Sequence, residues 1–105
     1  MVLNNAGYLD DKAFMSQTVD TWWKGMEING RGLAYMVHHF IATQPDPEKP
    51  VGTVISVLSG RVGLTLPNAS AYDTSKAFEM KFVEHLQLGT FFDLFPQPLL
   101  KWAHL

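Results

Sequence analysis

Hydrophobic residues along the chain form two short strand-like runs and two longer helical stripes. Residues 1–3 (MVL) are apolar and stop at Asn-Asn-Ala-Gly, which predicts a buried strand entering a loop. Residues 53–58 (TVISVL) are nearly continuous and β-branched, as expected of a parallel strand covered on both faces. Apolar residues recur at helical spacing over about 18–43 and 70–87. The order strand, helix, strand, helix predicts an α/β layered fold with right-handed crossovers.

Two segments between these elements are predicted to be loops, and the end of the chain has no assigned structure. Residues 44–50 (QPDPEKP) hold three prolines, which cannot all lie inside a helix. Residues 59–68 are punctuated by Gly and Pro. Residues 89–105 are apolar without a clear period, so this tail has no predicted place in the fold.

The first helical stripe contains an internal irregularity at Asn29-Gly30-Arg31-Gly32. Each Gly costs about 1 kcal/mol relative to Ala inside a helix. Asn29 also falls on the apolar side of this helix. One interpretation is a break into two short helices joined by an Asn-Gly turn. The other is a kink that presents backbone carbonyls and the amide to a buried polar site. The pattern alone favours neither.

The second helix carries apolar residues on two sides. Phe78, Phe82 and Leu86 form one stripe, and the other contains Tyr72, Lys76, Met80 and Val83. A helix buried on two sides packs on its own sheet and on something else, often a second subunit. The sequence therefore predicts a homo-oligomer or another partner docked through the helices.

Composition excludes several classes of function. The chain has 105 residues and a net charge of only -2, which indicates one small globular domain without a nucleic-acid or membrane-surface partner. It has no cysteine, so disulfides and thiolate metal sites are excluded and a reducing compartment such as the cytoplasm is expected. No apolar run approaches the roughly 20 residues of a membrane span. His38 and His39 point about 100° apart on a helix, so no metal site is predicted.

Tyr72 and Lys76 are four residues apart near the start of the second helix. Residues at this spacing share a helix face, and a neighbouring cation favours the phenolate form of a tyrosine. The pair could therefore transfer a proton near neutral pH. The alternative interpretation is a tyrosine packed on the core beside a lysine that extends its ammonium to solvent.

Four features together resemble the short-chain dehydrogenase/reductase family: the Asn4–Gly7 run, Asn29, Ser59, and Tyr72 with Lys76. Ser59 lies thirteen residues before Tyr72, at the end of the preceding strand. The resemblance implies a partial Rossmann fold, in which residues 1–88 are a β-α-β-α segment of a doubly wound parallel sheet. This segment resembles strands four and five of the family with the helices that follow them.

The resemblance also implies roles for individual residues. Tyr72 would be the general acid that protonates a carbonyl oxygen, or the base in alcohol oxidation. Lys76 would promote ionisation of Tyr72 and bind the nicotinamide ribose. Ser59 would hydrogen-bond the substrate oxygen. Asn29 would hold, through its backbone carbonyl, a water that links Lys76 to solvent.

The same resemblance implies a cofactor, NADP or NAD, and a small carbonyl or alcohol substrate. Asn5, Ala6 and Gly7 would lie against the cofactor, together with Tyr72 and Lys76. The family's Gly-rich pyrophosphate turn follows its first strand, whereas this sequence begins at what resembles the fourth. We therefore expect the chain to be inactive alone. The alternative is a non-catalytic module that docks on full-length family members.

Overall fold

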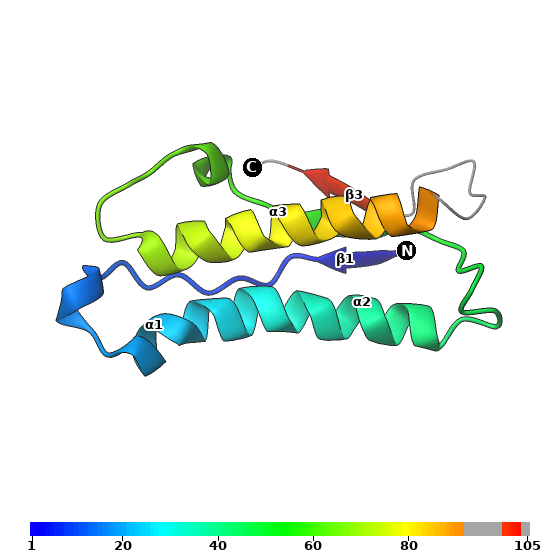
Figure 1. The fold of residues 1–105 in the computed structure, drawn as a ribbon, viewed down its shortest axis with the longest axis horizontal. Coiled ribbons are helices and arrows are strands. Elements are labelled where there is room, and N and C mark those ends of the chain that lie inside the picture. Colours follow the sequence, from blue (N-terminus) through cyan, green and yellow to red (C-terminus); the bar gives the residue numbers. More distant parts are fainter. Residues whose placement is uncertain (92–99, 104–105) are drawn as a thin grey trace.

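The computed structural model describes residues 1–91 and 100–103, with side-chain environments for residues 1–86. Its centre is a three-stranded parallel sheet with the order β1 (Val2–Asn4), β2 (Val54–Val57) and β3 (Leu100–Ala103) (Figure 1). In the register, Val54 lies opposite both Val2 and Leu100. Parallel neighbours joined through helices confirm the α/β fold predicted from the sequence.

The first helical stripe forms one uninterrupted helix in three parts, α1 (Val19–Gly25), η2 (Met26–Arg31) and α2 (Gly32–Ala42). Thr18 caps its start, because the Thr18 side-chain oxygen accepts a hydrogen bond from the Thr21 N–H at 3.1 Å. The middle part is π-helical, a rare geometry that often marks functional sites. The interpretation of a helix break is therefore wrong: the irregularity is absorbed by a wider turn.

The glycines of this helix allow close packing on the second long helix, α3 (Ser70–Phe91). A Cβ atom on Gly25 would lie 3.3 Å from the Ala71 Cβ. A Cβ atom on Gly30 would lie 3.0 Å from the Cδ1 of Phe78. The absent side chains thus bring η2 against the first half of α3, where the predicted site residues are.

Helices α2 and α3 run side by side in one layer against the sheet (Figure 1). The hydrophobic core lies where they meet β2, and its buried members are Leu33, Val37, Val54 and Val83. Two short 3₁₀ turns, η1 (Phe14–Ser16) and η3 (Gly60–Gly63), lie in the connections. The second turn falls inside a segment predicted to be only loop.

Three expectations need correction. The strand at β2 was expected to be covered on both faces, but buried Val54 and Ser56 alternate with half-buried Ile55 and Val57. Among the described residues, helices pack on one face only. Helix α3 ends at Phe91, four residues beyond the predicted end. Part of the unassigned segment 89–105 forms β3, while 92–99 and 104–105 lie outside the described residues.

Candidate active site

Tyr72 and Lys76 lie one turn apart on α3, on the same side of the helix, as their spacing predicts. The Lys76 Nζ is 5.9 Å from the centroid of the Tyr72 ring. Lys76 is 3% exposed, and Tyr72 is half-buried. The interpretation of a lysine that extends to solvent is therefore wrong. A buried ammonium next to a half-buried phenol is compatible with proton transfer.

The ammonium of Lys76 is held from two sides. Its Nζ donates to the backbone carbonyl of Val57 at 3.2 Å and to the Oε1 of Glu79 at 2.9 Å. Val57 is the last residue of β2, so the lysine joins α3 to the end of the central strand. These contacts fix the direction of the ammonium, because each uses one of its three N–H donors.

Glu79 is a buried acidic residue that the sequence reasoning did not identify. Its side chain is completely buried, and its Oε2 accepts a hydrogen bond from the Ser56 hydroxyl at 3.0 Å. Ser56 in turn accepts from the side-chain amide of Asn4 at 3.2 Å. Burial raises the pKa of Glu79, and the hydrogen bond and charge of Lys76 partly oppose this effect. Two signals were present in the sequence: opposite charges at i and i+3, and a serine inside an apolar strand.

Asn29 points into the core from η2 and ties together the loop after β1 and helix α3. Its Oδ1 accepts from the Tyr8 N–H at 2.7 Å. Its Nδ2 donates to the Tyr8 carbonyl at 3.0 Å and to the Ser75 hydroxyl at 2.8 Å. The side chain is 1% exposed, so of the two interpretations the structure supports the one in which this amide faces buried polar groups.

The Asn-Asn-Ala-Gly loop passes directly over Lys76. Asn5, Ala6 and Gly7 are exposed. A Cβ atom on Gly7 would lie 3.7 Å from the Lys76 Nζ and 3.9 Å from the Asn29 Oδ1. The fold therefore brings Gly7, Asn29, Tyr72 and Lys76 into one region, although they are spread over more than sixty residues of sequence.

Ser59 lies two residues beyond β2 and caps the turn η3. Its hydroxyl accepts from the Arg61 N–H at 3.2 Å, and no hydrogen bond joins it to Tyr72 among the described residues. Arg61 connects the two indirectly, because its guanidinium carbon is 5.2 Å from the Tyr72 ring centroid. Arg61 also forms ion pairs with Asp73 at 3.2 Å and with Asp11 at 3.6 Å. Sequence reasoning missed Arg61, which carries no distinguishing motif.

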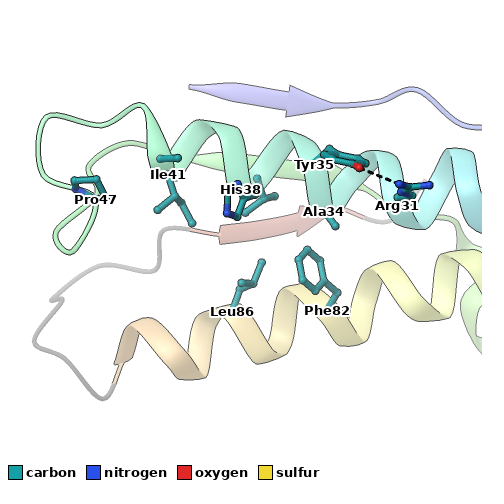
Figure 2. Close-up of a pocket in the computed structure, with 10 residues that line it drawn as sticks. Arg31, Ala34, Tyr35, His38, Ile41, Pro47, Phe82 and Leu86 are labelled. Carbon is teal, nitrogen blue, oxygen red and sulfur yellow. Dashed lines mark hydrogen bonds between the residues drawn. The ribbon is translucent and has the colours of Figure 1, made fainter.

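A separate apolar groove of about 730 Å³ lies between α2 and α3, and Figure 2 shows its lining. Phe82 and Leu86 of α3 face Ala34, His38 and Ile41 of α2 across it. It contains none of the predicted site residues. Within residues 1–91 and 100–103, no group of three His, Asp or Glu side chains could hold a metal ion. No helix in this part of the chain is long and apolar enough to cross a membrane.

The chain belongs to the short-chain dehydrogenase family of oxidoreductases, since the family's sequence model, described as short chain dehydrogenase, matches residues 1–90. A curated relative is 11-beta-hydroxysteroid dehydrogenase-like 3 of Arabidopsis thaliana, which is 32% identical over 88 residues. That alignment covers 83% of this chain but only 28% of the relative. The chain thus spans less than a third of the length of this relative.

Solved structures show the same fold. A short chain dehydrogenase/reductase from Burkholderia phymatum in complex with NAD superposes with a TM-score of 0.77 at 18% identity, covering 97% of this chain and 35% of the other. The landomycin C-6 ketoreductase LanV, with bound NADP and rabelomycin, superposes with a TM-score of 0.75 at 20% identity, covering 97% and 38%. These likenesses confirm a segment of a Rossmann fold.

Proposed function

We propose that this chain carries the proton-transfer part of a nicotinamide-dependent active site that reduces a carbonyl or oxidises an alcohol. The observation that supports it best is the buried ammonium of Lys76, one helical turn from Tyr72 and directly below the Gly7 loop. A buried cation beside a phenol suits acid–base chemistry, and the exposed loop leaves access for a ligand.

The residues fit a nicotinamide cofactor. Two N–H donors of Lys76 are used by Val57 and Glu79, and the third has no acceptor among residues 1–86. A ribose hydroxyl would suit that donor, while Asn5, Ala6 and Gly7 would lie against the cofactor. Such a cofactor supplies or accepts the hydride. The solved relatives carry either NADP or NAD, and we propose one of these two for this chain.

Each side chain then has a defined task. Tyr72 gives its phenolic proton to the substrate oxygen in the reducing direction and recovers it in the oxidising direction. The positive charge of Lys76 stabilises the phenolate that remains. The Ser59 hydroxyl donates a hydrogen bond to the substrate oxygen and can keep its present contact, in which its oxygen accepts from the Arg61 N–H. Asn29 would hold, through its backbone carbonyl, a water that links Lys76 to solvent.

The chain alone is expected not to turn over a nicotinamide cofactor. Proton donation accelerates a reaction only when the hydride donor is held within reaction distance, and this chain spans about 35–38% of two solved relatives. The test is an NMR titration of the chain with NADH and with NADPH. Weak binding should shift the signals of Gly7, Tyr72 and Lys76, and a Lys76→Met variant should lose these shifts. Micromolar binding with turnover would refute inactivity, and shifts elsewhere would refute the site.

A Tyr72→Phe variant separates catalysis from binding. In any longer polypeptide that contains these residues and is active, this change should lower kcat by orders of magnitude while the cofactor Kd stays within about twofold. The ring remains, so its contacts with Arg61 and Lys76 should persist. Undiminished turnover in the variant would exclude Tyr72 as the proton donor.

The second candidate function is a docking module, favoured by the apolar groove between α2 and α3. The occupant we propose is a helical face of a full-length member of the same family. Tyr35 is 63% exposed at this groove, so Tyr35→Glu should abolish co-purification with such a protein. Trp23→Glu is the matched control, because Trp23 is 52% exposed and does not line the groove. If the chain remains a monomer when it is mixed with full-length members of the family, this candidate is excluded.

A further inference from the structure

The proposed proton transfer assigns no role to Glu79, yet this residue is fully buried beside Lys76, which has one. Each of its carboxylate oxygens has a partner: Lys76 Nζ lies 2.9 Å from Oε1, and the Ser56 hydroxyl lies 3.0 Å from Oε2. Asn4 then donates to Ser56 at 3.2 Å. The carboxylate is thus held by the sheet through one oxygen and holds the lysine through the other.

A second pair on the same helix shows what is unusual here. Lys81 and Glu84 have the same i, i+3 spacing and a similar distance of 3.0 Å, but their side chains are 68% and 41% exposed. Those of Lys76 and Glu79 are 4% and 0% exposed. Water screens the attraction between Lys81 and Glu84, so that pair holds its side chains weakly. The Lys76–Glu79 pair is shielded from water, so its attraction is stronger and restrains the position of the ammonium.

We propose that Glu79 is a positioning residue for Lys76. It holds the ammonium at the end of β2, so that the one N–H donor left by Val57 and Glu79 faces the region between Gly7 and Tyr72. The inference rests on the proposed function in one respect, namely that Lys76 serves a bound ribose and the phenolate of Tyr72. The hold on the ammonium itself can be measured without a cofactor.

Two considerations connect this hold to chemistry. Lys76 has four rotatable side-chain bonds, so one contact with the Val57 carbonyl would leave its nitrogen in several positions. A charged acceptor on the other side restricts these positions and makes a stronger hydrogen bond than a neutral one.

The test is competitive labelling of amines in the complete chain by reductive methylation, with mass spectrometry of each lysine. The reagent must reach the nitrogen, so an amine that is buried and held by two acceptors is protected. In the wild-type chain Lys76 should react at least about tenfold more slowly than Lys81, whose side chain is 68% exposed. In Glu79→Gln, which keeps the shape but replaces the charge-assisted hydrogen bond by a weaker neutral one, the Lys76 rate should rise about tenfold, while Lys81 is unchanged. Glu84→Gln is the matched control and should leave Lys76 unchanged.

A purely structural role for Glu79 predicts a different result. The Glu79→Gln chain would then lose stability but keep the wild-type rate at Lys76, which would overturn the proposal. Equal rates for Lys76 and Lys81 in the wild-type chain would overturn it as well. If every lysine in Glu79→Gln reacts faster, that variant is unfolded, and the Lys76 rate in a Ser56→Ala variant tests the proposal instead. That variant frees one carboxylate oxygen, so Lys76 should react about threefold faster, and an unchanged rate would count against positioning.

The same variants keep this inference separate from the proposed function. If NADH and NADPH cause no shift at Lys76 but the labelling pattern is as expected, the positioning stands and the cofactor proposal fails. The opposite result is also informative. If the cofactors shift the NMR signal of Lys76 equally in the wild-type and the folded Glu79→Gln chain, and the methylation rate of Lys76 is the same in both, the cofactor proposal stands and the positioning proposal fails. Glu79→Asp, which keeps the charge on a shorter side chain, should restore part of the protection.

Discussion

Replacing Asn29 by alanine should detach the loop that follows β1 from the helix beneath it. The change removes three hydrogen bonds, two to the backbone of Tyr8 and one to the Ser75 hydroxyl. All three involve a side chain that is 1% exposed. Because Gly7 precedes Tyr8, release of Tyr8 also releases the part of the loop that passes over Lys76.

The expected loss follows from how well each former partner can be satisfied again. A typical hydrogen bond contributes about 0.5–1.5 kcal/mol net, and a buried partner left without one costs more. Ser75 keeps its hydrogen bond to the Tyr72 carbonyl at 2.7 Å, and the half-buried Tyr8 is within reach of water. Alanine also recovers about 0.5 kcal/mol of helix propensity. The free energy of unfolding should therefore fall by about 2–3 kcal/mol, which lowers the Tm by about 10–20 °C.

Thermal and urea unfolding followed by circular dichroism measure this loss, and hydrogen exchange of the Tyr8 amide measures release of the loop. Ile28→Ala is the matched control, because Ile28 is a neighbour in η2 and is 46% exposed. Its effect should stay below about 0.5 kcal/mol. A double-mutant cycle with Ser75→Ala should give a coupling of about 1 kcal/mol. A loss below 0.5 kcal/mol with unchanged exchange at Tyr8 would refute the reasoning.

Two further predictions concern the glycines and the buried acid. Gly30→Ala should lower the free energy of unfolding, because the new Cβ would lie 3.0 Å from the Phe78 ring. Gly32→Ala should raise it by about 1 kcal/mol, because no described atom lies within 4 Å of the new Cβ and alanine favours a helix. Urea unfolding of both variants measures these changes. Burial raises the pKa of Glu79 above the ordinary value of 4.5, so between these values the folded chain holds a proton that the unfolded chain has lost. The free energy of unfolding should fall as pH rises through that window and level off above it, and Glu79→Gln should remove this part of the slope.

The sequence predicted the elements well where local pattern decides them. The strand at β2 and the helix start at Thr18 follow from residues that are contiguous in the chain. The π-helical turn was not predictable, because it depends on how Gly25 and Gly30 meet α3, a contact between distant segments. Helix α3 continues to Phe91 although Gly89, a common helix-ending residue, follows the predicted end, so the local pattern did not determine this boundary.

The site was predictable in part for a similar reason. Tyr72 and Lys76 are visible because they share a helix face, and the resemblance adds Asn29 and the loop at Gly7. Glu79 was missed because its significance lies in a contact with Ser56, twenty-three residues away on another element. Charged pairs at i and i+3 are common on helix surfaces, and only burial distinguishes this one from Lys81 and Glu84.

The pairing of β1 with β2 also affects how the chain is made. Val2 lies opposite Val54, so the first strand leaves the ribosome long before its partner exists. At about 5–20 residues per second, synthesis of the intervening segment takes roughly 3–10 s. Helix α1–η2–α2 can form within that interval from local contacts alone, whereas β1 has not yet met β2. Until β2 is made, apolar Val2 and Leu3 lack this partner strand and are open to chaperones or to other nascent chains.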